Sequence, residues 1–427
     1  MRNRAFTLGV INGALVMVVA SMVRPDLVLS AFVLRLTSST FLAALPTALM
    51  HLGGLWPQLI VAHIAEGLPR KKPIYIISNA SRILSLMAMA LTAYLLGEES
   101  PVLLATLCLF CFFVYSSGCG GSGIAFMDIV ARTIPATRRG SFMGLRGFYG
   151  GALGLGAGFF VRYMLGSEGL AFPLNYAALF TTAAIFLACA TSLFAAVNEP
   201  PAVQKKERGS FREHLQRGVA SLREDDNYRL LVVVRSLMGT IAVGQVVFIP
   251  YAIVGLSLPD SIVGVLMILA ACLSLPANFL WSHIGDRHGN RLLILIAGAV
   301  YLAAPVLALT SSYLPTWSTG GWLPAEYDLR ALTFVLAFVL GAAGMRGAMM
   351  GSTNYLLEIA PDERRPSYMA FMRVLQAPSA LLAPLLGGIV ADLISFQAAF
   401  ALACLAGAVT LALTVKLKEP RQTNAAK

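Results

Sequence analysis

Charged side chains are scarce in this sequence. Asp, Glu, Lys and Arg make up 12% of its 427 residues and hydrophobic residues make up 57%, whereas soluble domains carry about 25% charge. Three long stretches contain no Asp, Glu, Lys or Arg: residues 8–23, 102–114 and 398–415. This composition excludes a soluble enzyme, a nucleic-acid-binding module and a disulfide-stabilised secreted domain.

Cysteine and histidine are also rare, and their positions argue against a metal or redox site. All six cysteines fall within apolar segments rather than loops, where they are most simply buried small hydrophobes. Cys108 and Cys111 form a C-x-x-C pair, but no other Cys or His stands nearby at ligand spacing. We therefore expect no metal site and no cofactor.

Acidic residues are missing from the middle of every apolar stretch. Those near the stretches, such as Glu66 and Asp392, lie toward an end. Proton coupling usually needs a carboxylate or His that changes charge within the pathway. His51 is the central candidate, and a lone His in such a place is more often a hydrogen-bonded packing residue.

The apolar stretches themselves predict twelve membrane-spanning helices, because a hydrocarbon core of roughly 30 Å requires about 20 helical residues. The first of them could continue past Pro25 to Arg35. The predicted helices cover residues 5–23, 38–63, 74–96, 102–132, 142–165, 173–197, 229–254, 261–284, 291–312, 330–357, 367–391 and 395–416.

The net charge of +11 fits this topology better than a nucleic-acid partner. If both termini are cytoplasmic, most Lys and Arg residues fall on inner segments, as the positive-inside rule requires. The polar stretch 198–228 then becomes a cytoplasmic linker, within which 210–222 could form an amphipathic helix or a solvated basic loop. The predicted domains are a six-helix bundle at 1–197, the linker at 198–228 and a second six-helix bundle at 229–427.

The two halves carry an internal repeat. The segment IPATRRGSFM at 134–143 aligns with APDERRPSYM at 360–369, and HIAEGLPRK at 63–71 aligns with HIGDRHGNR at 283–291. Both matches occur in the same order and at corresponding predicted loops. The chain therefore consists of two related halves.

The run GDRHGNR, from Gly285 to Arg291, resembles the G-x-x-x-D-R-x-G-R-R/K loop signature of the major facilitator superfamily. The resemblance extends over the whole chain, and the first half contains a decayed copy in which Glu66 replaces the Asp. It implies an all-α integral membrane fold of twelve helices in two pseudo-symmetric bundles, and alternating-access transport. It also implies that the first, fourth, seventh and tenth helices surround a central cavity.

This signature predicts a charged gate at the inner face. Gly289 permits a tight turn with positive φ, and Asp286 can accept hydrogen bonds from the start of a neighbouring helix. The family pattern implies that Asp286 docks on the start of the eleventh helix and that the Arg reaches Glu358. The alternative is a set of solvated charges that only fix topology. The predicted gate residues are Gly285, Asp286, Arg287, Gly289, Arg291, Glu358 and Glu66.

Arg346 is the leading candidate for substrate binding. It lies near the middle of the predicted helix 330–357, where an ionisable residue is costly and therefore a functional candidate. The alternative is a packing role, with Arg346 bonded to carbonyl groups or to Asn354. Weaker cavity candidates are Asn12, Tyr115, Ser116, Arg235 and Gln245.

Other intramembrane groups are interpreted as structural. Arg146 lies close enough to a predicted cytoplasmic end to reach the membrane surface, and Asp128 can pair with Arg132 one helical turn away. The small-residue run 116–123 allows either close helix packing or room for a ligand.

The sequence therefore predicts a secondary transporter, not an enzyme, that moves a small solute by rocking two bundles about a midplane site, with Arg346 favouring an anionic substrate. Two alternatives stay open: a receptor or assembly factor that has lost transport, and an integral-membrane enzyme. Against the enzyme, no metal, nucleophile or phosphate-binding motif is present. We expect a monomer in the bacterial cytoplasmic membrane whose partners are membrane lipid and the solute.

Overall fold

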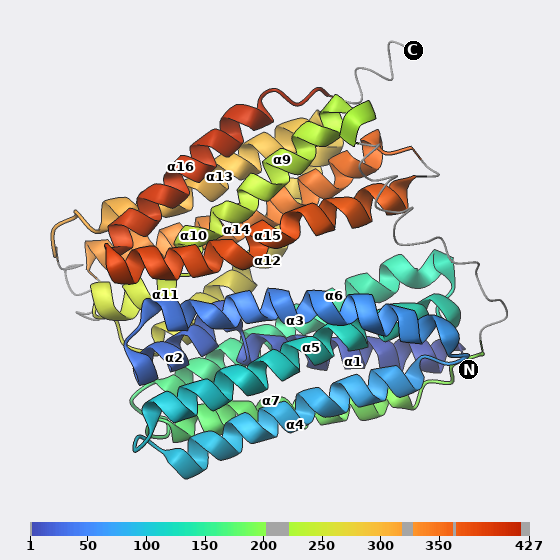
Figure 1. Ribbon diagram of the computed structural model, residues 1–427, viewed down its shortest axis with the longest axis horizontal. Helices are drawn as coiled ribbons and strands as arrows, with labels where there is room; N and C mark the ends of the chain where they lie inside the picture. The colour runs from blue at the N-terminus through green and yellow to red at the C-terminus, as the bar shows by residue number, and fades with distance from the viewer. Residues whose placement is uncertain (1, 202–221, 318–327, 362–363, 420–427) are drawn as a thin grey trace. The chain divides into compact units, whose positions relative to one another are not determined.

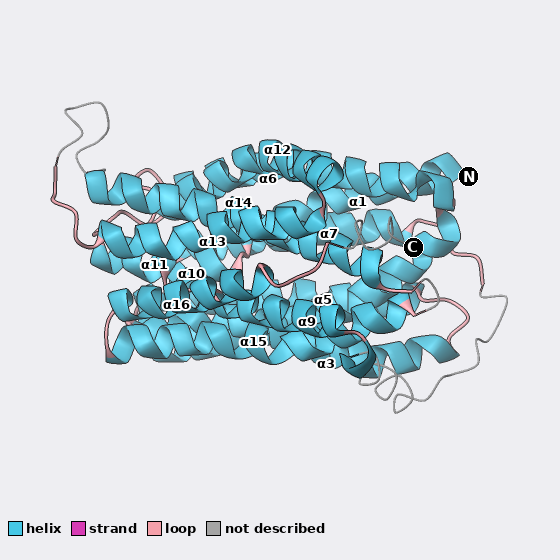
Figure 2. Ribbon diagram, turned by 90° about the horizontal axis from the view of Figure 1, so that it is seen from above, coloured by secondary structure: helices cyan, strands magenta, loops and turns pink. Residues whose placement is uncertain are grey.

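The structure is a computed structural model that describes residues 2–201, 222–317, 328–361 and 364–419. Every regular element in these ranges is a helix, and no strand occurs among them (Figure 2). Ten of the helices are long and apolar enough to cross a membrane. The all-α prediction is confirmed, and the predicted count of twelve spans is consistent with these ten.

The helices of the first half follow the predicted segments closely. The first predicted helix does continue past Pro25, because a π-helical turn at that residue leads directly into α2. The elements are α1 (Arg2–Met22), η1 (Pro25–Leu29), α2 (Ser30–Thr37), α3 (Thr40–Gly67), α4 (Lys72–Leu96), α5 (Pro101–Thr133), η2 (Ala136–Arg138), α6 (Arg139–Leu165) and α7 (Leu174–Ala195).

In the second half, the segment predicted as one helix at 229–254 is broken into several short pieces. Pro250 contributes to the interruption because it has no backbone N–H to donate. The elements are α9 (Asp226–Thr240), α10 (Ala242–Gln245), α11 (Phe248–Pro250), η3 (Tyr251–Gly255), α12 (Ile262–His288), α13 (Asn290–Ser311), α14 (Leu329–Ile359), α15 (Arg365–Leu393) and α16 (Phe396–Thr414).

The chain forms two compact units, residues 1–206 with 259–271, and residues 207–258 with 272–427. In the first unit, α5 packs on α3 and α4, while α1 packs on α6 and α7 (Figure 1). In the second unit, α13 packs on α14 and α16, and α9 packs on α15 and α16. Residues 202–221 lie outside the described residues, so the linker, its amphipathic segment and the predicted domain boundaries stay predictions.

The small-residue run of α5 brings α5 close to its neighbours. A Cβ at Gly118 would lie 2.6 Å from the Ser78 carbonyl oxygen of α4, and one at Gly120 would lie 2.9 Å from the Gly54 carbonyl oxygen of α3. Gly123, one turn further, has no atom of the described residues within 4 Å of its Cβ position and lines a cavity. Both predicted uses of this run, close packing and open space, therefore occur along one helix.

A carboxylate that sequence inspection assigned to the linker caps α4. Glu199 is buried, and its oxygens accept hydrogen bonds from the backbone N–H groups of Lys71 at 2.6 Å and Lys72 at 2.9 Å. Arg132 Nη1 lies 3.7 Å from the same carboxylate. Arg132 also forms the predicted ion pair with Asp128, at 2.6 Å.

The second unit has a glutamate at the corresponding place. Glu419 follows the last helix as Glu199 follows α7, and each precedes a proline. Its carboxylate lies beside Gly289, the residue before α13, where a Cβ would be 2.8 Å from Oε1. A carboxylate at a helix N-terminus is stabilised by the free N–H groups and by the helix dipole. The internal repeat therefore extends to the placement of these two acids beside the start of a helix.

We expect Glu199→Gln to lower the free energy of unfolding by about 1–3 kcal/mol, because one buried and one partly buried N–H group lose a charged acceptor. The measurement is the melting temperature of the purified protein. Glu98→Gln, at an exposed position after α4, is the matched control and should melt with the unaltered chain. Equal melting of both variants would show that the Glu199 carboxylate does not stabilise this junction.

Candidate functional site

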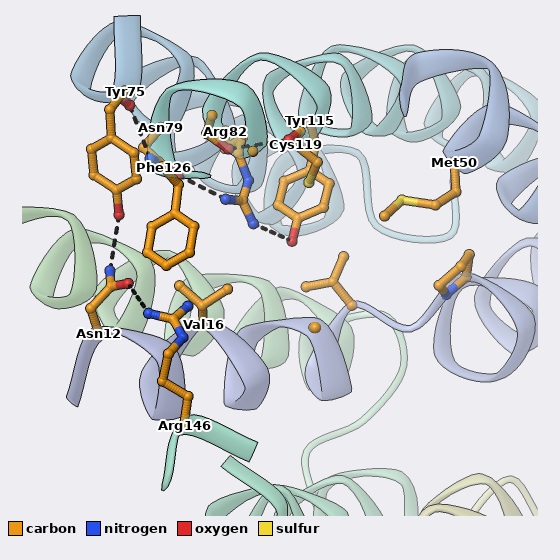
Figure 3. Close-up of a pocket in the computed structure, with 15 residues that line it drawn as sticks. Asn12, Val16, Met50, Tyr75, Asn79, Arg82, Tyr115, Cys119, Phe126 and Arg146 are labelled. Atoms are coloured by element: carbon orange, nitrogen blue, oxygen red, sulfur yellow. Dashed lines mark hydrogen bonds between the residues drawn. The ribbon is translucent and has the colours of Figure 1, made fainter. Parts of the chain in front are cut away.

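A cavity of about 310 Å³ lies inside the first unit. Residues of α1, α3, α4, α5 and α6 line it (Figure 3). Two of the lining residues are arginines, Arg82 and Arg146, and none is Asp or Glu. The cavity is therefore cationic.

Arg82 comes from the middle of α4 and is only 5% exposed. Its Nη1 donates to Asn79 Oδ1 at 2.7 Å, and its Nη2 donates to the Tyr115 hydroxyl at 3.1 Å. The guanidinium carbon lies 4.8 Å from the centre of the Tyr115 ring. Its Nε has no hydrogen-bond partner among the described residues. Arg82 thus has spare donor capacity beside the cavity.

The local sequence explains why Arg82 holds this position. Asn79 precedes it by three residues and therefore lies on the same face of α4. On α5, Gly118 leaves space for the arginine side chain, because a Cβ there would lie 2.5 Å from Arg82 Cγ. The Arg82 guanidinium is therefore fixed from two helices.

Arg146, from α6, forms a second cationic group in the cavity wall. Its Nη1 donates to the Gly9 carbonyl oxygen at 2.6 Å and to Asn12 Oδ1 at 3.2 Å. Its guanidinium lies 4.2 Å from the centre of the Phe126 ring. Asn12 Nδ2 in turn donates to the Tyr75 hydroxyl at 2.9 Å. This network joins α1, α4 and α6 (Figure 3).

The partners of both arginines are neutral. Among the described residues, neither guanidinium pairs with a carboxylate. A buried charge is costly unless it is paired, and within a membrane protein such a residue is a functional candidate by default. The arrangement can bind an anion, which would supply the missing negative charge.

Two of the predicted cavity residues, Asn12 and Tyr115, line this cavity. Ser116, next to Tyr115, instead donates to the Leu49 carbonyl oxygen at 3.0 Å and packs α5 against α3. From the sequence, Arg146 is expected to reach the membrane surface. In the structure its guanidinium instead packs over Phe126 in the cavity wall.

The other predicted cavity residues lie in the second unit. Arg235 donates from Nη1 to Ser352 Oγ and from Nε to Gln376 Oε1 at 3.4 Å. Gln245 lies beside Gly341, and Arg346 is exposed on α14. Their part in a shared substrate site stays a prediction.

The predicted gate turn has the expected geometry at one residue. Gly289 has φ +90°, as predicted, and it alone separates α12 from α13. Asn290 Nδ2 donates to Glu358 Oε1 at 3.0 Å, so Asn290 is a partner of Glu358 that the sequence did not suggest. The gate's function stays a prediction.

The remaining gate residues differ in their surroundings. Gly285 is buried, whereas Asp286 and Arg287 are exposed. Arg291 Nη2 donates to the Val415 carbonyl oxygen at 2.7 Å, which ties the turn to the end of α16. The Glu66 side chain lies outside the described part of the structure.

Sequence reasoning missed Arg82, Asn79 and Tyr75. The rule that singled out Arg346, an ionisable residue in the middle of an apolar helix, applies equally to Arg82. An Asn three residues earlier was a second available signal. What the sequence could not show is that α5 presents Tyr115 to this arginine.

Comparison with known families identifies the fold. A model described as Major Facilitator Superfamily matches residues 5–325 and 231–427. An uncharacterized protein of Mycobacterium tuberculosis is 25% identical over 287 residues, covering 65% of this chain and 52% of that protein. An uncharacterized protein of Mycobacterium bovis gives the same values. The chain spans about half the length of the curated relatives it matches.

Solved transporter structures share the fold at low sequence identity. A mutant of the nucleoside transporter NupG has a TM-score of 0.76 and 10% identity, covering 97% of this chain and 100% of that one. A bacterial homologue of the iron transporter ferroportin in an inward-facing state has a TM-score of 0.72 and 12% identity, covering 97% and 98%. A D-xylose–proton symporter has a TM-score of 0.70 and 16% identity, covering 98% of both chains.

Proposed function

The chain belongs to the major facilitator superfamily, and from that premise we propose that it is a secondary transporter of a small organic anion. The observation that carries the proposal is the buried Arg82 guanidinium in a cavity with no acidic lining residue. An anion that binds there supplies the charge that the cavity lacks. The substrate then crosses the membrane as the two halves alternate in access.

The chemistry of Arg82 suits a carboxylate or a similar oxyanion. A guanidinium offers five N–H donors in a planar fork, and two of its nitrogens already donate to Asn79 and Tyr115. These neutral partners orient the fork without neutralising it. Phosphate or carboxylate oxygens form charge-assisted hydrogen bonds to such a group, which are about twice as strong as neutral ones.

Uptake into proteoliposomes that contain the purified full chain tests the proposal. A panel of labelled solutes of similar size should be divided into anionic, neutral and cationic members. We expect time-dependent uptake of at least one anionic class and none of the cations. Binding of an anion without uptake would favour the receptor alternative, and chemical conversion of a solute would favour the enzyme alternative.

The proposed topology places both termini in the cytoplasm of a bacterial cell, with a monomer in the cytoplasmic membrane. An impermeant maleimide applied to intact cells should then label Glu98→Cys, after α4, and not Thr137→Cys, after α5. Both positions are exposed. The unaltered chain with its six native cysteines is the reference for background. Labelling of position 137 from outside would reverse the orientation.

A further inference from the structure

The cavity around Arg82 has two chemically different parts. One is polar and contains Asn12, Tyr75, Asn79, Arg82, Tyr115 and Arg146. The other is apolar and contains Val16, Ala20, Val23, Pro25, Met50 and Phe126. Figure 3 shows that Val16 and Phe126 lie close to Arg146, whereas Met50 lies at the other end of the cavity. In Figure 3, Arg82 and Tyr115 lie between Asn12 on one side and Met50 on the other.

The apolar part follows one stripe of α1. Asn12, Val16 and Ala20 are spaced four residues apart on α1 and share one helix face. Val23, the residue after α1, continues this face, because its N–H still donates to the Val19 carbonyl oxygen at 3.0 Å. At 1.5 Å per residue, the wall from Val16 to Val23 extends about 10 Å. A single helix face therefore changes from polar at Asn12 to apolar beyond it.

The two arginines differ in their surroundings, and Arg82 is the more deeply buried of the two. Arg146 donates to the Gly9 carbonyl and to Asn12, and it lies between the rings of Phe126 and Phe142. Arg82 keeps an unpartnered Nε and is nine-tenths buried. The cavity thus places the buried Arg82 guanidinium beside an apolar wall.

From this arrangement we infer the substrate class, and the inference rests on the proposed function. The anion is amphiphilic: one carboxylate-like group binds Arg82, and an aliphatic or aromatic group lies along Val16, Ala20 and Met50. A polyhydroxylated anion of the same size would place hydroxyl groups against this wall, where they lose hydrogen bonds to water without replacement.

A matched series of sodium carboxylates tests the inference by thermal stabilisation of the purified full chain at constant ionic strength. Acetate, butyrate and hexanoate extend the apolar tail, while gluconate has the length of hexanoate but carries hydroxyl groups. We expect affinity to rise about threefold to fourfold for each added methylene, which corresponds to the transfer free energy of one buried CH₂. Gluconate should bind no better than acetate.

A substitution in the apolar wall separates the dependence of affinity on tail length from general stabilisation of the protein by amphiphiles. Val16→Thr keeps the shape and adds a hydroxyl group, and Val102→Thr makes the same change at a 68% exposed position on α5. Val16→Thr should weaken hexanoate binding several-fold and leave acetate binding unchanged, and Val102→Thr should alter neither.

The outcomes distinguish the proposed anion site from the inference that the anion is amphiphilic. If gluconate binds as tightly as hexanoate, and both require Arg82, the amphiphile inference is overturned and the anion site is retained. If no carboxylate gives a shift that Arg82→Gln removes, the proposed anion site itself is wrong. A chain-length dependence that Arg82→Gln abolishes and Val16→Thr reduces supports both.

Discussion

Arg82→Gln is expected to lower the affinity for the transported anion by at least about 30-fold. Removal of one partner of a buried charged pair costs roughly 2–5 kcal/mol, and each 1.4 kcal/mol is a factor of ten. Arg82→Lys keeps the charge but loses the planar fork, so an intermediate loss of about tenfold is expected. The measurement is anion-induced stabilisation of each purified variant.

The control for charge removal is Arg162→Gln, at an exposed position near the end of α6. It should bind the anion as the unaltered chain does. If Arg82 serves only to hold α4 to α5 through Tyr115, a different pattern is expected. Both Arg82 variants would then melt at lower temperature, while the remaining folded protein would bind the anion normally.

Gly118→Ala is expected to affect both stability and binding. The added Cβ would lie 2.5 Å from Arg82 Cγ and 2.6 Å from the Ser78 carbonyl oxygen, and the backbone of α4 cannot move away from α5 without loss of packing. Overpacking of this kind costs about 1–3 kcal/mol. We expect a lower melting temperature together with a weaker response to the anion, because Arg82 is displaced.

The matched control is Gly151→Ala on α6, where no atom lies within 4 Å of the Cβ position. There alanine should stabilise the helix slightly, by about 0.5–1 kcal/mol. A Gly118→Ala variant that behaves like Gly151→Ala would show that α4 and α5 are not in close contact at this position. The placement of Arg82 would then need revision.

The sequence predicted the helices well because their signal is local. A run of apolar residues between charges is enough to define a span, and Gly289 marks the break between α12 and α13 because it adopts a positive φ that side chains disfavour. The segment 226–255 was less accurately predicted. Its interruptions depend on how the short helical pieces pack against neighbouring helices, and the composition of the segment does not indicate this.

The site was harder to predict because it depends on which helix faces meet. Arg82 and Arg346 look alike in the sequence, since each is a cation within an apolar run. The contacts of Arg82 come from Tyr115, 33 residues away, and those of Glu199 come from the start of α4, 128 residues away. Helical periodicity identifies one face of each helix but does not pair faces across such separations.

The measurement that tests the central claim most directly is uptake of one labelled organic anion by proteoliposomes that contain either the unaltered chain or Arg82→Gln at equal density. Saturable uptake is expected for the unaltered chain, and uptake at the level of empty liposomes is expected for the variant. Equal uptake by both proteins would show that the cationic cavity of the first unit is not the transport site.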